Sequence, residues 1–327
     1  MTDDLRDVMR LLRRCRRALV LVHMAPDGDA IGSALAMSRI LKMLGKEPRI
    51  SSPDPIPQQY SFLPGWDEIG SQSLTGEDLV VALDNSPLAR FGPVGQTVAE
   101  AGVAIVNIDH HVTNARFGNA DLVRAEAAAT AEILFDLLDP LEVSLEPGLA
   151  TCLLTGLFTD TRGFRTANTS PRVLEIAARL AAEGASLPEI SEEVYGRNSL
   201  PKLRLWGMIL DRVQADGHLV WAANTQEMRA ACGASEDDAE GAVNLLATLD
   251  QAQWVLLFTE RANGAIDVSV RTRSGHDASA LAREFGGGGH PQAAGFELQG
   301  GLAEAEARVL AAARERLGVP ERQPASP

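Results

Sequence analysis

The chain has 327 residues, of which 45% are hydrophobic, and its formal net charge at pH 7 is −14. At roughly 150 residues per domain this length predicts two domains, and the hydrophobic content excludes a disordered chain. The acidic excess argues against binding of duplex DNA, because affinity for that polyanion comes mainly from Lys and Arg at its phosphates.

Short apolar segments alternate with helical patterns through the first half of the chain. The segments that predict strands are 18–23, 48–52, 79–84 and 104–109. The segments that predict helices are 30–44, 94–102, 127–139, 146–158 and 171–183. This alternation is typical of right-handed crossovers between parallel strands, so the first half is predicted to be an α/β domain with a parallel sheet.

The pattern changes after a turn-rich segment. Predicted strands at 218–225, 253–260 and 265–273 and helices near 235–249 and 278–285 indicate a smaller α+β domain, with a hairpin at the turn RANG. The predicted boundaries are 1–183 for the first domain, 184–199 for a linker, 200–317 for the second domain and 318–327 for a tail.

Three predicted strands end in groups that coordinate metals. The residues at these ends are His23, Asp27, Asp29, Asp84, Asp109, His110 and His111. The carboxyl edge of a parallel sheet is where open α/β folds bind ligands. Asp160 ends an apolar helix, where the helix dipole disfavours a carboxylate, so a positive group is expected beside it.

Carboxylates combined with imidazoles form a mixed oxygen and nitrogen ligand set. This set is softer than a magnesium site and lacks the thiolates of structural zinc, so Mn²⁺ is the first choice, with Mg²⁺ or Co²⁺ as alternatives. Two divalent ions would neutralise four carboxylates, and such a pair can activate a hydroxide and hold a phosphoryl group. The predicted reaction is hydrolysis of a phosphate ester.

The segments HMAPDGDAIGS, LDNS, NIDHH and TDTRGFRTANTS, in this order, resemble the four motifs of the DHH phosphoesterase superfamily. FGGGGHPQAAGF resembles the glycine-rich motif of the DHH-associated C-terminal domain, and a two-domain chain of this length looks most like the oligoribonuclease and pAp phosphatase (nanoRNase) family. The resemblance implies an active site in the cleft between the two domains. Arg162 stands where many relatives have Gly.

The resemblance also implies roles for individual residues. The implied metal ligands are His23, Asp27, Asp29, Asp84, His110 and Asp160, with Asp84 and Asp160 shared between two ions. His111 is implied to face the substrate phosphate, so His111 and Asp84 form the catalytic set, and Asp109 would orient an imidazole.

In the second domain, Asp267, Ser269, Arg271 and Arg273 are predicted to share the polar face of one strand. Arginines followed by a glycine segment suit a terminal phosphate, although a tight loop beside solvated arginines gives the same pattern. The family resemblance favours the first interpretation, in which these residues bind a phosphate of the substrate. The predicted substrate-binding residues are Arg271, Arg273, Gly287, Gly288, Gly289 and His290.

The predicted function is hydrolysis of oligoribonucleotides of two to five nucleotides to nucleoside monophosphates, and of pAp to AMP and phosphate. One alternative is a cyclic or linear dinucleotide phosphodiesterase acting on c-di-AMP or pApA. A second is a nucleotide-binding regulatory module without activity.

Three scattered cysteines, an acidic N-terminus and short apolar segments predict a cytoplasmic protein without disulfides or membrane contact. The oligomeric state is left open, with a homodimer as one option.

Overall fold

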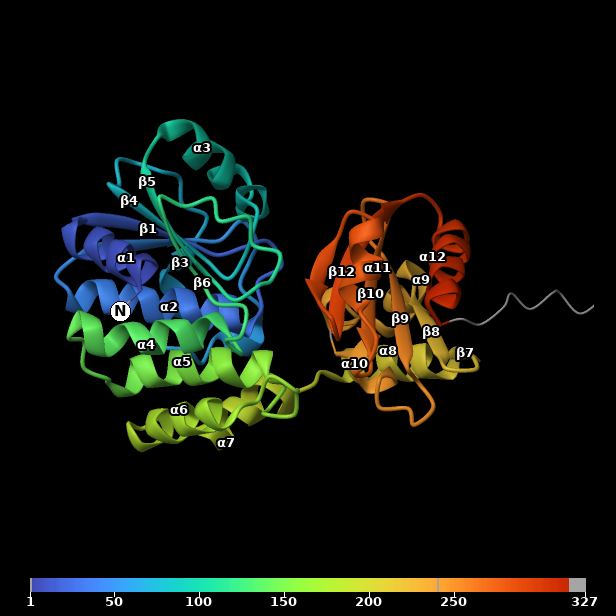
Figure 1. The fold of residues 1–327 in the computed structure, drawn as a ribbon. Coiled ribbons are helices and arrows are strands. Elements are labelled where there is room, and N and C mark those ends of the chain that lie inside the picture. Colours follow the sequence, from blue (N-terminus) through green and yellow to red (C-terminus); the bar gives the residue numbers. More distant parts are fainter. Residues whose placement is uncertain (1, 240, 318–327) are drawn as a thin grey trace, which may run out of the picture. The chain divides into compact units, whose positions relative to one another are not determined.

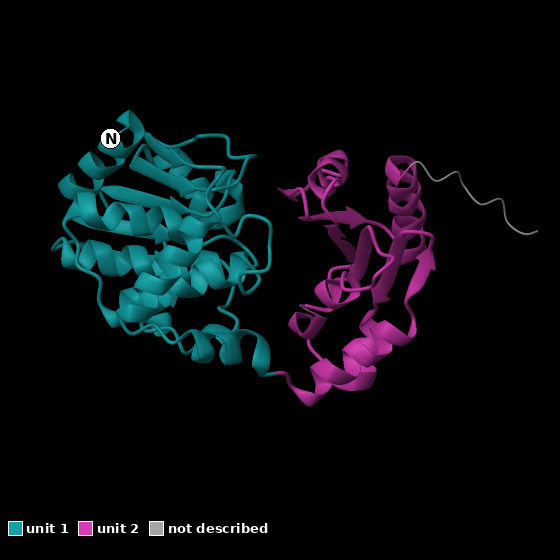
Figure 2. Cartoon of the chain, turned by 60° about the horizontal axis from the view of Figure 1, so that its bottom comes forward, with its two compact units in different colours: residues 1–197 teal, residues 198–327 magenta. Residues whose placement is uncertain are grey.

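A computed structural model of the chain describes residues 2–239 and 241–317 (Figure 1). The predicted tail, 318–327, lies outside the described residues. The chain divides into two compact units between Arg197 and Asn198 (Figure 2). The segment 184–197 belongs to the first unit, where it forms helix α7 (Leu187–Ser191) and the π-helical turn Glu192–Gly196.

The first unit is built on a parallel sheet with the strand order β3-β2-β1-β4-β5-β6. The strands are β1 (Arg17–Leu21), β2 (Glu47–Ser51), β3 (Ile69–Gly70), β4 (Leu79–Leu83), β5 (Ala104–Asp109) and β6 (Ala120–Val123). β1 and β4 are buried on both faces and consist almost entirely of Leu, Val and Ala, as expected for central parallel strands.

Helices cover both faces of this sheet (Figure 1). The helices of this unit are α1 (Asp3–Arg14), α2 (Gly28–Met43), α3 (Pro93–Ala101), α4 (Thr130–Leu141), α5 (Pro147–Asp160) and α6 (Pro171–Ala182). Of these, α5 packs on α2 and α4, and α6 packs on α5. α3 and the short turn Leu88–Phe91 bury Leu19, Leu21 and Val80 on one face. The main core lies on the other face, against α1, α2, α4 and α5.

Close contact between α2 and α5 depends on glycine. A Cβ atom on Gly32 would lie 2.5 Å from the Cys152 carbonyl oxygen, and one on Gly156 would lie 2.5 Å from Asp29 Oδ1. Neither distance is tolerated by real Cβ atoms, so only glycine allows these helices to approach this closely. The same approach places the end of α5 near the start of α2.

The second unit contains a mixed sheet with the strand order β11-β12-β10-β9-β8-β7. Its strands are β7 (Gln214–Asp216), β8 (Leu219–Asn224), β9 (Trp254–Glu260), β10 (Ala265–Thr272), β11 (Gly288–His290) and β12 (Ala293–Gln299). Its helices are α8 (Leu200–Asp211), α9 (Gln226–Cys232), α10 (Ala242–Leu246), α11 (Ala278–Glu284) and α12 (Leu302–Leu317). β9 and β10 form the predicted antiparallel hairpin, while β8 and β9 are parallel.

The predicted α/β fold with a smaller α+β domain is confirmed. The single helix predicted over 235–249 is wrong, because the structure has a 3-10 turn at Asp237–Ala239 and then α10. Gly241 adopts a left-handed φ of +89° between them, which a continuous right-handed helix does not accommodate. Across the described residues, every helix is too short or too polar to span a bilayer.

Candidate active site

The candidate site lies where the strand order of the first sheet reverses direction. Strands β1, β4 and β5 are neighbours in the sheet and all run the same way, so their carboxyl ends meet at one edge. His23 follows β1, Asp84 follows β4 directly, and Asp109 ends β5. The point between β1 and β4 is the switch point at which open α/β sheets bind ligands.

Two more carboxylates come from the start of α2. Asp27 caps the helix, accepting hydrogen bonds through Oδ1 from the backbone N–H groups of Asp29 and Ala30 at 3.1 and 3.0 Å. Asp29 is fully buried and accepts from the N–H groups of Thr130 and Ala131 at 2.6 and 3.1 Å. Asp29 therefore faces the N-termini of both α2 and α4, whose dipoles favour a negative charge.

Backbone carbonyls orient two of the imidazoles. His23 Nδ1 donates to the Met24 carbonyl at 2.8 Å, and His110 Nδ1 donates to the Ala127 carbonyl at 3.2 Å. Because a carbonyl only accepts, Nδ1 carries the proton and Nε2 is the nitrogen that a neutral ring presents to a metal. His23 Nε2 lies 3.8 Å from Asp84 Oδ2, and His110 Nε2 lies 3.1 Å from Asp160 Oδ2.

The predicted metal ligands assemble into compact groups. Potential ligand atoms lie within 4.8 Å of one another in one group of His23, Asp27 and Asp84 and in another of Asp29, His110 and Asp160. Asp84 also lies close to the second group, with its Oδ1 3.4 Å from His110 Nε2. The donor chemistry and the spacing fit two divalent cations that share Asp84.

The concentration of carboxylates changes their protonation. Burial, followed by the charges of Asp84 and Asp160, raises the pKa of Asp29 well above its usual range. Burial alone would raise the pKa of Asp84, but the nearby imidazoles of His110 and His23 outweigh it and hold that pKa well below its usual range. Without added positive charge, the repulsion between these buried carboxylates is reduced only when some of them take up protons. Bound cations would neutralise the carboxylates instead.

His111 has a different environment from the other two histidines. Its Nδ1 donates to Asp109 Oδ1 at 2.7 Å, and Asp109 also accepts from the backbone N–H of His110 and from Asn114 Nδ2. Burial opposes protonation of His111, but the hydrogen bond and charge of Asp109 outweigh it and raise its pKa. The side chain is 27% exposed, so this ring can present a proton to a ligand.

Two family models and several curated proteins resemble this chain. Residues 17–157 match the model of the DHH family N-terminal domain, and residues 226–318 match that of the DHHA1 domain. The bifunctional oligoribonuclease and PAP phosphatase NrnA of Thermus thermophilus is 38% identical over 94% of both chains. The chain belongs to the DHH phosphoesterase family.

Other relatives of the DHH chain are more distant. NrnA of Bacillus subtilis is 26% identical over 84% of this chain and 87% of that protein. The cyclic-di-AMP phosphodiesterase PdeA of Listeria monocytogenes is 24% identical over 93% of this chain but only 48% of that protein. A solved exopolyphosphatase-related protein from Bacteroides fragilis superposes with a TM-score of 0.86 at 25% identity, covering 96% of this chain and 98% of that chain.

Thr130, at the start of α4, is a residue of the DHH site that the sequence analysis missed. Its hydroxyl donates to Asp84 Oδ1 at 2.9 Å while its backbone N–H donates to Asp29. One residue therefore positions two carboxylates that are far apart in the sequence. The only available signal was a Thr near the start of the helix predicted at 127–139, and helix starts commonly carry Thr without any catalytic reason.

In the DHHA1 domain, the predicted substrate-binding residues lie on β10, on the loop after it, in the turn before β11 and on β11. Arg271 is half-buried and its Nε donates to Asn244 Oδ1 at 2.9 Å, whereas Arg273 is exposed and donates to the Leu249 carbonyl. β11 contains Gly288, Gly289 and His290 and pairs with β12.

Packing explains two of the glycines in this segment. A Cβ atom on Gly287 would lie 2.2 Å from the Gly295 carbonyl oxygen, and Gly289 has a φ of +133°. The Gly287 N–H donates to the Ala282 carbonyl at 2.8 Å, which closes the end of α11. Gly288 has open space above its Cα atom.

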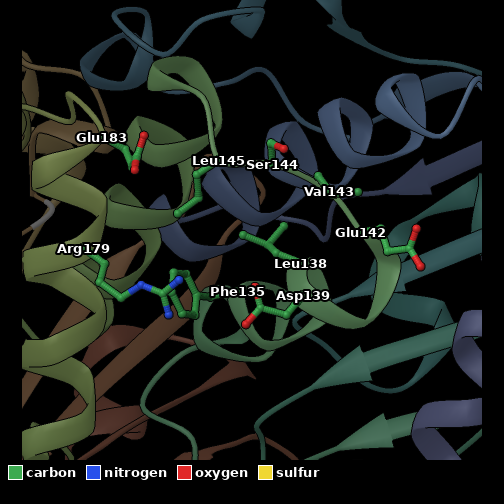
Figure 3. A pocket seen from close by; sticks show the side chains of 9 residues that line it. All are labelled: Phe135, Leu138, Asp139, Glu142, Val143, Ser144, Leu145, Arg179 and Glu183. Atoms are coloured by element: carbon green, nitrogen blue, oxygen red, sulfur yellow. The ribbon is translucent and has the colours of Figure 1, made fainter.

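A pocket of about 500 Å³ lies elsewhere on the DHH domain (Figure 3). It is lined by residues of α4, of the loop that follows and of α6, including Asp139, Glu142 and Glu183. Arg179 lies over the Phe135 ring at 4.9 Å within it. Three carboxylates beside one arginine repel a phosphate, and the pocket contains none of the candidate metal ligands, so it is not the phosphoesterase site.

Proposed function

We propose that this chain is a manganese-dependent phosphoesterase that hydrolyses oligoribonucleotides of two to five nucleotides to nucleoside monophosphates, and pAp to AMP and phosphate. The observation that carries the proposal is the pair of carboxylate and imidazole groups around Asp84 at the switch point of the sheet. Their chemistry suits phosphoryl transfer, and the relatives named as oligoribonuclease and PAP phosphatase supply the substrate class.

The residues that would hold the metals are two sets of three. His23, Asp27 and Asp84 would hold one ion, and Asp29, His110 and Asp160 the other, with Asp84 shared. When bound, the ions would supply activation of a water molecule and neutralisation of the phosphate charge. Mn²⁺ suits this mixture of oxygen and nitrogen donors better than Mg²⁺, which prefers oxygen donors and bound waters.

His111 would act on the substrate through its second nitrogen. Asp109 accepts a hydrogen bond from His111 Nδ1–H, which fixes the ring orientation and favours the charged form of the ring. A protonated His111 would donate from Nε2 to a phosphate oxygen as negative charge develops there, or pass its proton to the leaving oxygen. Asn114, which donates to Asp109 Oδ2 at 2.6 Å, would support this arrangement by holding the carboxylate in place.

Replacement of Thr130 by Val is expected to weaken both metal binding and turnover without unfolding the protein. Valine keeps the shape of the side chain but removes the hydroxyl that donates to Asp84. Loss of a partner that orients a metal ligand costs roughly ten- to a hundredfold in metal affinity or activity. Isothermal titration with Mn²⁺ and initial rates on pApA test this expectation.

The matched control is Thr155→Val, because Thr155 is also fully buried but donates its hydroxyl only to the Thr151 carbonyl of its own helix. Equal effects of the two substitutions would contradict a role for the Thr130 hydroxyl at Asp84.

The DHHA1 domain would hold the end of the substrate that does not react. Arg271 and Arg273 carry positive charge on and beside β10, and Gly288, Gly289 and His290 form a short strand with an imidazole donor. These groups suit a terminal phosphate, and two phosphates are the distinguishing feature of pAp and pApA. The proposal assigns the chemistry to the DHH domain and substrate selection to the DHHA1 domain.

His290→Ala is expected to raise KM more than it lowers kcat. Loss of one charge-assisted hydrogen bond to a phosphate costs about 1.5–3 kcal/mol, roughly ten- to a hundredfold in affinity. Steady-state kinetics on pApA separate the two constants. His218→Ala is the control, since His218 is an exposed histidine of the same unit. A lower Mn²⁺ affinity in His290→Ala would contradict this division of labour between the domains.

A substrate panel with Mn²⁺, run beside a chelated control, tests the function itself. The panel contains pAp, pApA, c-di-AMP and RNAs from two to twenty-four nucleotides. Efficiency is expected to be highest at two to four nucleotides, because each further phosphate meets the surface of a chain with a net charge of −14. Efficiency that rises up to twenty nucleotides and falls steeply with salt would indicate an extended groove instead.

A dinucleotide phosphodiesterase is the second candidate, favoured by the similarity to PdeA over 93% of this chain. Preferential hydrolysis of c-di-AMP in the same panel would support it. Absence of turnover on every substrate would favour the regulatory module.

A further inference from the structure

The turn that follows α5 has an uncommon backbone. Arg162, Gly163 and Phe164 adopt left-handed φ values of +48°, +72° and +62° in succession. Thr161 holds the turn, since its hydroxyl donates to the Leu157 carbonyl at 2.6 Å and accepts from the Phe164 N–H at 3.0 Å. The turn begins directly after Asp160, so the position of Arg162 is set relative to a proposed metal ligand.

Arg162 occupies a position that glycine would adopt at lower cost, because a Cβ atom crowds the carbonyl oxygen in the left-handed region. Its side chain is half-buried. Within residues 2–239 and 241–317, no hydrogen-bond acceptor or carboxylate pairs with its guanidinium group. A strained backbone that holds a half-buried, unpaired cation calls for a ligand outside the described chain.

The neighbours of Arg162 define the chemistry of that ligand. Tyr195 and Asp160 both lie close enough to Arg162 to interact with it electrostatically. The Phe158 ring lies between Phe164 and Tyr195, at centroid distances of 5.9 and 5.4 Å, and Tyr195 is 45% exposed. A cation beside an exposed aromatic ring suits an anion that carries a planar base.

The position of Arg162 near Asp160 also indicates which ligand the guanidinium group binds. A guanidinium group repels divalent cations, so it does not help the carboxylates to hold metals. It would instead attract an anion that reaches the metals, and its planar N–H groups match two oxygens of a phosphate. We propose that Arg162 is a substrate-binding residue whose guanidinium group contacts the scissile phosphate of the nucleotide. The inference rests on the proposed function.

The test compares Arg162→Gly and Arg162→Lys with a matched control. Arg116 is also an arginine with a left-handed φ, of +49°, but it is exposed and pairs with Asp4 at 3.3 Å. Arg116→Gly therefore relieves the same backbone strain and keeps the backbone N–H that Arg116 donates to Asn114. Initial rates on pApA with Mn²⁺, the dissociation constant of AMP with Mn²⁺ present, the Mn²⁺ affinity and the melting temperature are measured for each variant.

Arg162→Gly is expected to lower kcat/KM roughly ten- to a hundredfold and to weaken AMP binding at least tenfold, with an unchanged or higher melting temperature. Arg162→Lys should retain part of the kcat/KM and part of the AMP affinity, and Arg116→Gly should behave as the wild type. The Mn²⁺ affinity of Arg162→Gly should stay the same or rise, because a repelling cation has been removed.

Two results would overturn the inference. The first is an Arg162→Gly protein whose kcat/KM and whose dissociation constant for AMP both lie within threefold of the wild-type values. The other is a parallel loss of Mn²⁺ affinity and activity, which would mean that Arg162 acts by shaping the turn. Failure of the wild-type protein to hydrolyse any nucleotide would instead refute the proposed function, so the two failures are distinguishable.

Discussion

Asp84→Asn is expected to abolish hydrolysis of pApA and pAp while the fold stays intact. Asp84 lies between His23 and His110 and belongs to both proposed metal groups, so the substitution removes the shared ligand. Loss of about 4 kcal/mol of transition-state stabilisation corresponds to roughly a thousandfold fall in rate. Initial rates with Mn²⁺ test the loss of hydrolysis, and a circular dichroism spectrum tests whether the fold stays intact.

Asp78→Asn is the control for this substitution. Asp78 precedes β4 at the opposite end of the same strand and accepts hydrogen bonds from the backbone N–H groups of Arg16 and Arg17. Its replacement should lower stability but leave kcat near the wild-type value. An Asp84→Asn protein that retains near-native turnover would refute the proposal of a shared metal ligand.

Mn²⁺ is expected to stabilise the folded protein strongly. The proposed ligands come from distant segments of the chain and are assembled only in the folded state. A ligand at about a thousand times its dissociation constant raises the free energy of unfolding by about 4 kcal/mol per site. Mn²⁺ would also offset the burial and the neighbouring carboxylate charges that together raise the pKa of Asp29. Thermal unfolding with Mn²⁺ and with a chelator measures the difference.

The stabilisation should be smaller in Asp84→Asn, which loses the shared ligand, and unchanged in Asp78→Asn. Chelation should also reduce hydrolysis by the wild-type protein to the background rate. A melting temperature that is the same with Mn²⁺ and with chelator would count against metal binding by these residues.

Local patterns in the sequence were sufficient to predict the strands that carry the site. β1, β4 and β5 are apolar segments bounded by polar residues, so their ends could be located without knowledge of their neighbours. Candidate ligands such as Asp84 could be named because they follow these ends. In the second unit, alternation of polar and apolar residues predicted β10 and its hairpin with β9.

Predictions of longer helices were less reliable where the conformation of a single residue determines whether the helix continues. The segment 235–249 has helical composition, yet Gly241 adopts a left-handed conformation and separates Asp237–Ala239 from α10. Local composition does not show whether a glycine within a helical pattern is tolerated or ends the helix.

Contacts between distant segments were decided by the tertiary structure alone. Thr130 donates to Asp84, 46 residues away, and to Asp29, 101 residues away, and no local pattern marks these pairs. That the Arg162 guanidinium finds no partner among residues 2–239 and 241–317 likewise depends on which side chains surround it. The sequence by itself determined the elements and the chemical types at their ends, since these follow from local periodicity. Only the tertiary structure decided which of these groups meet, because their contacts depend on sheet order and helix packing.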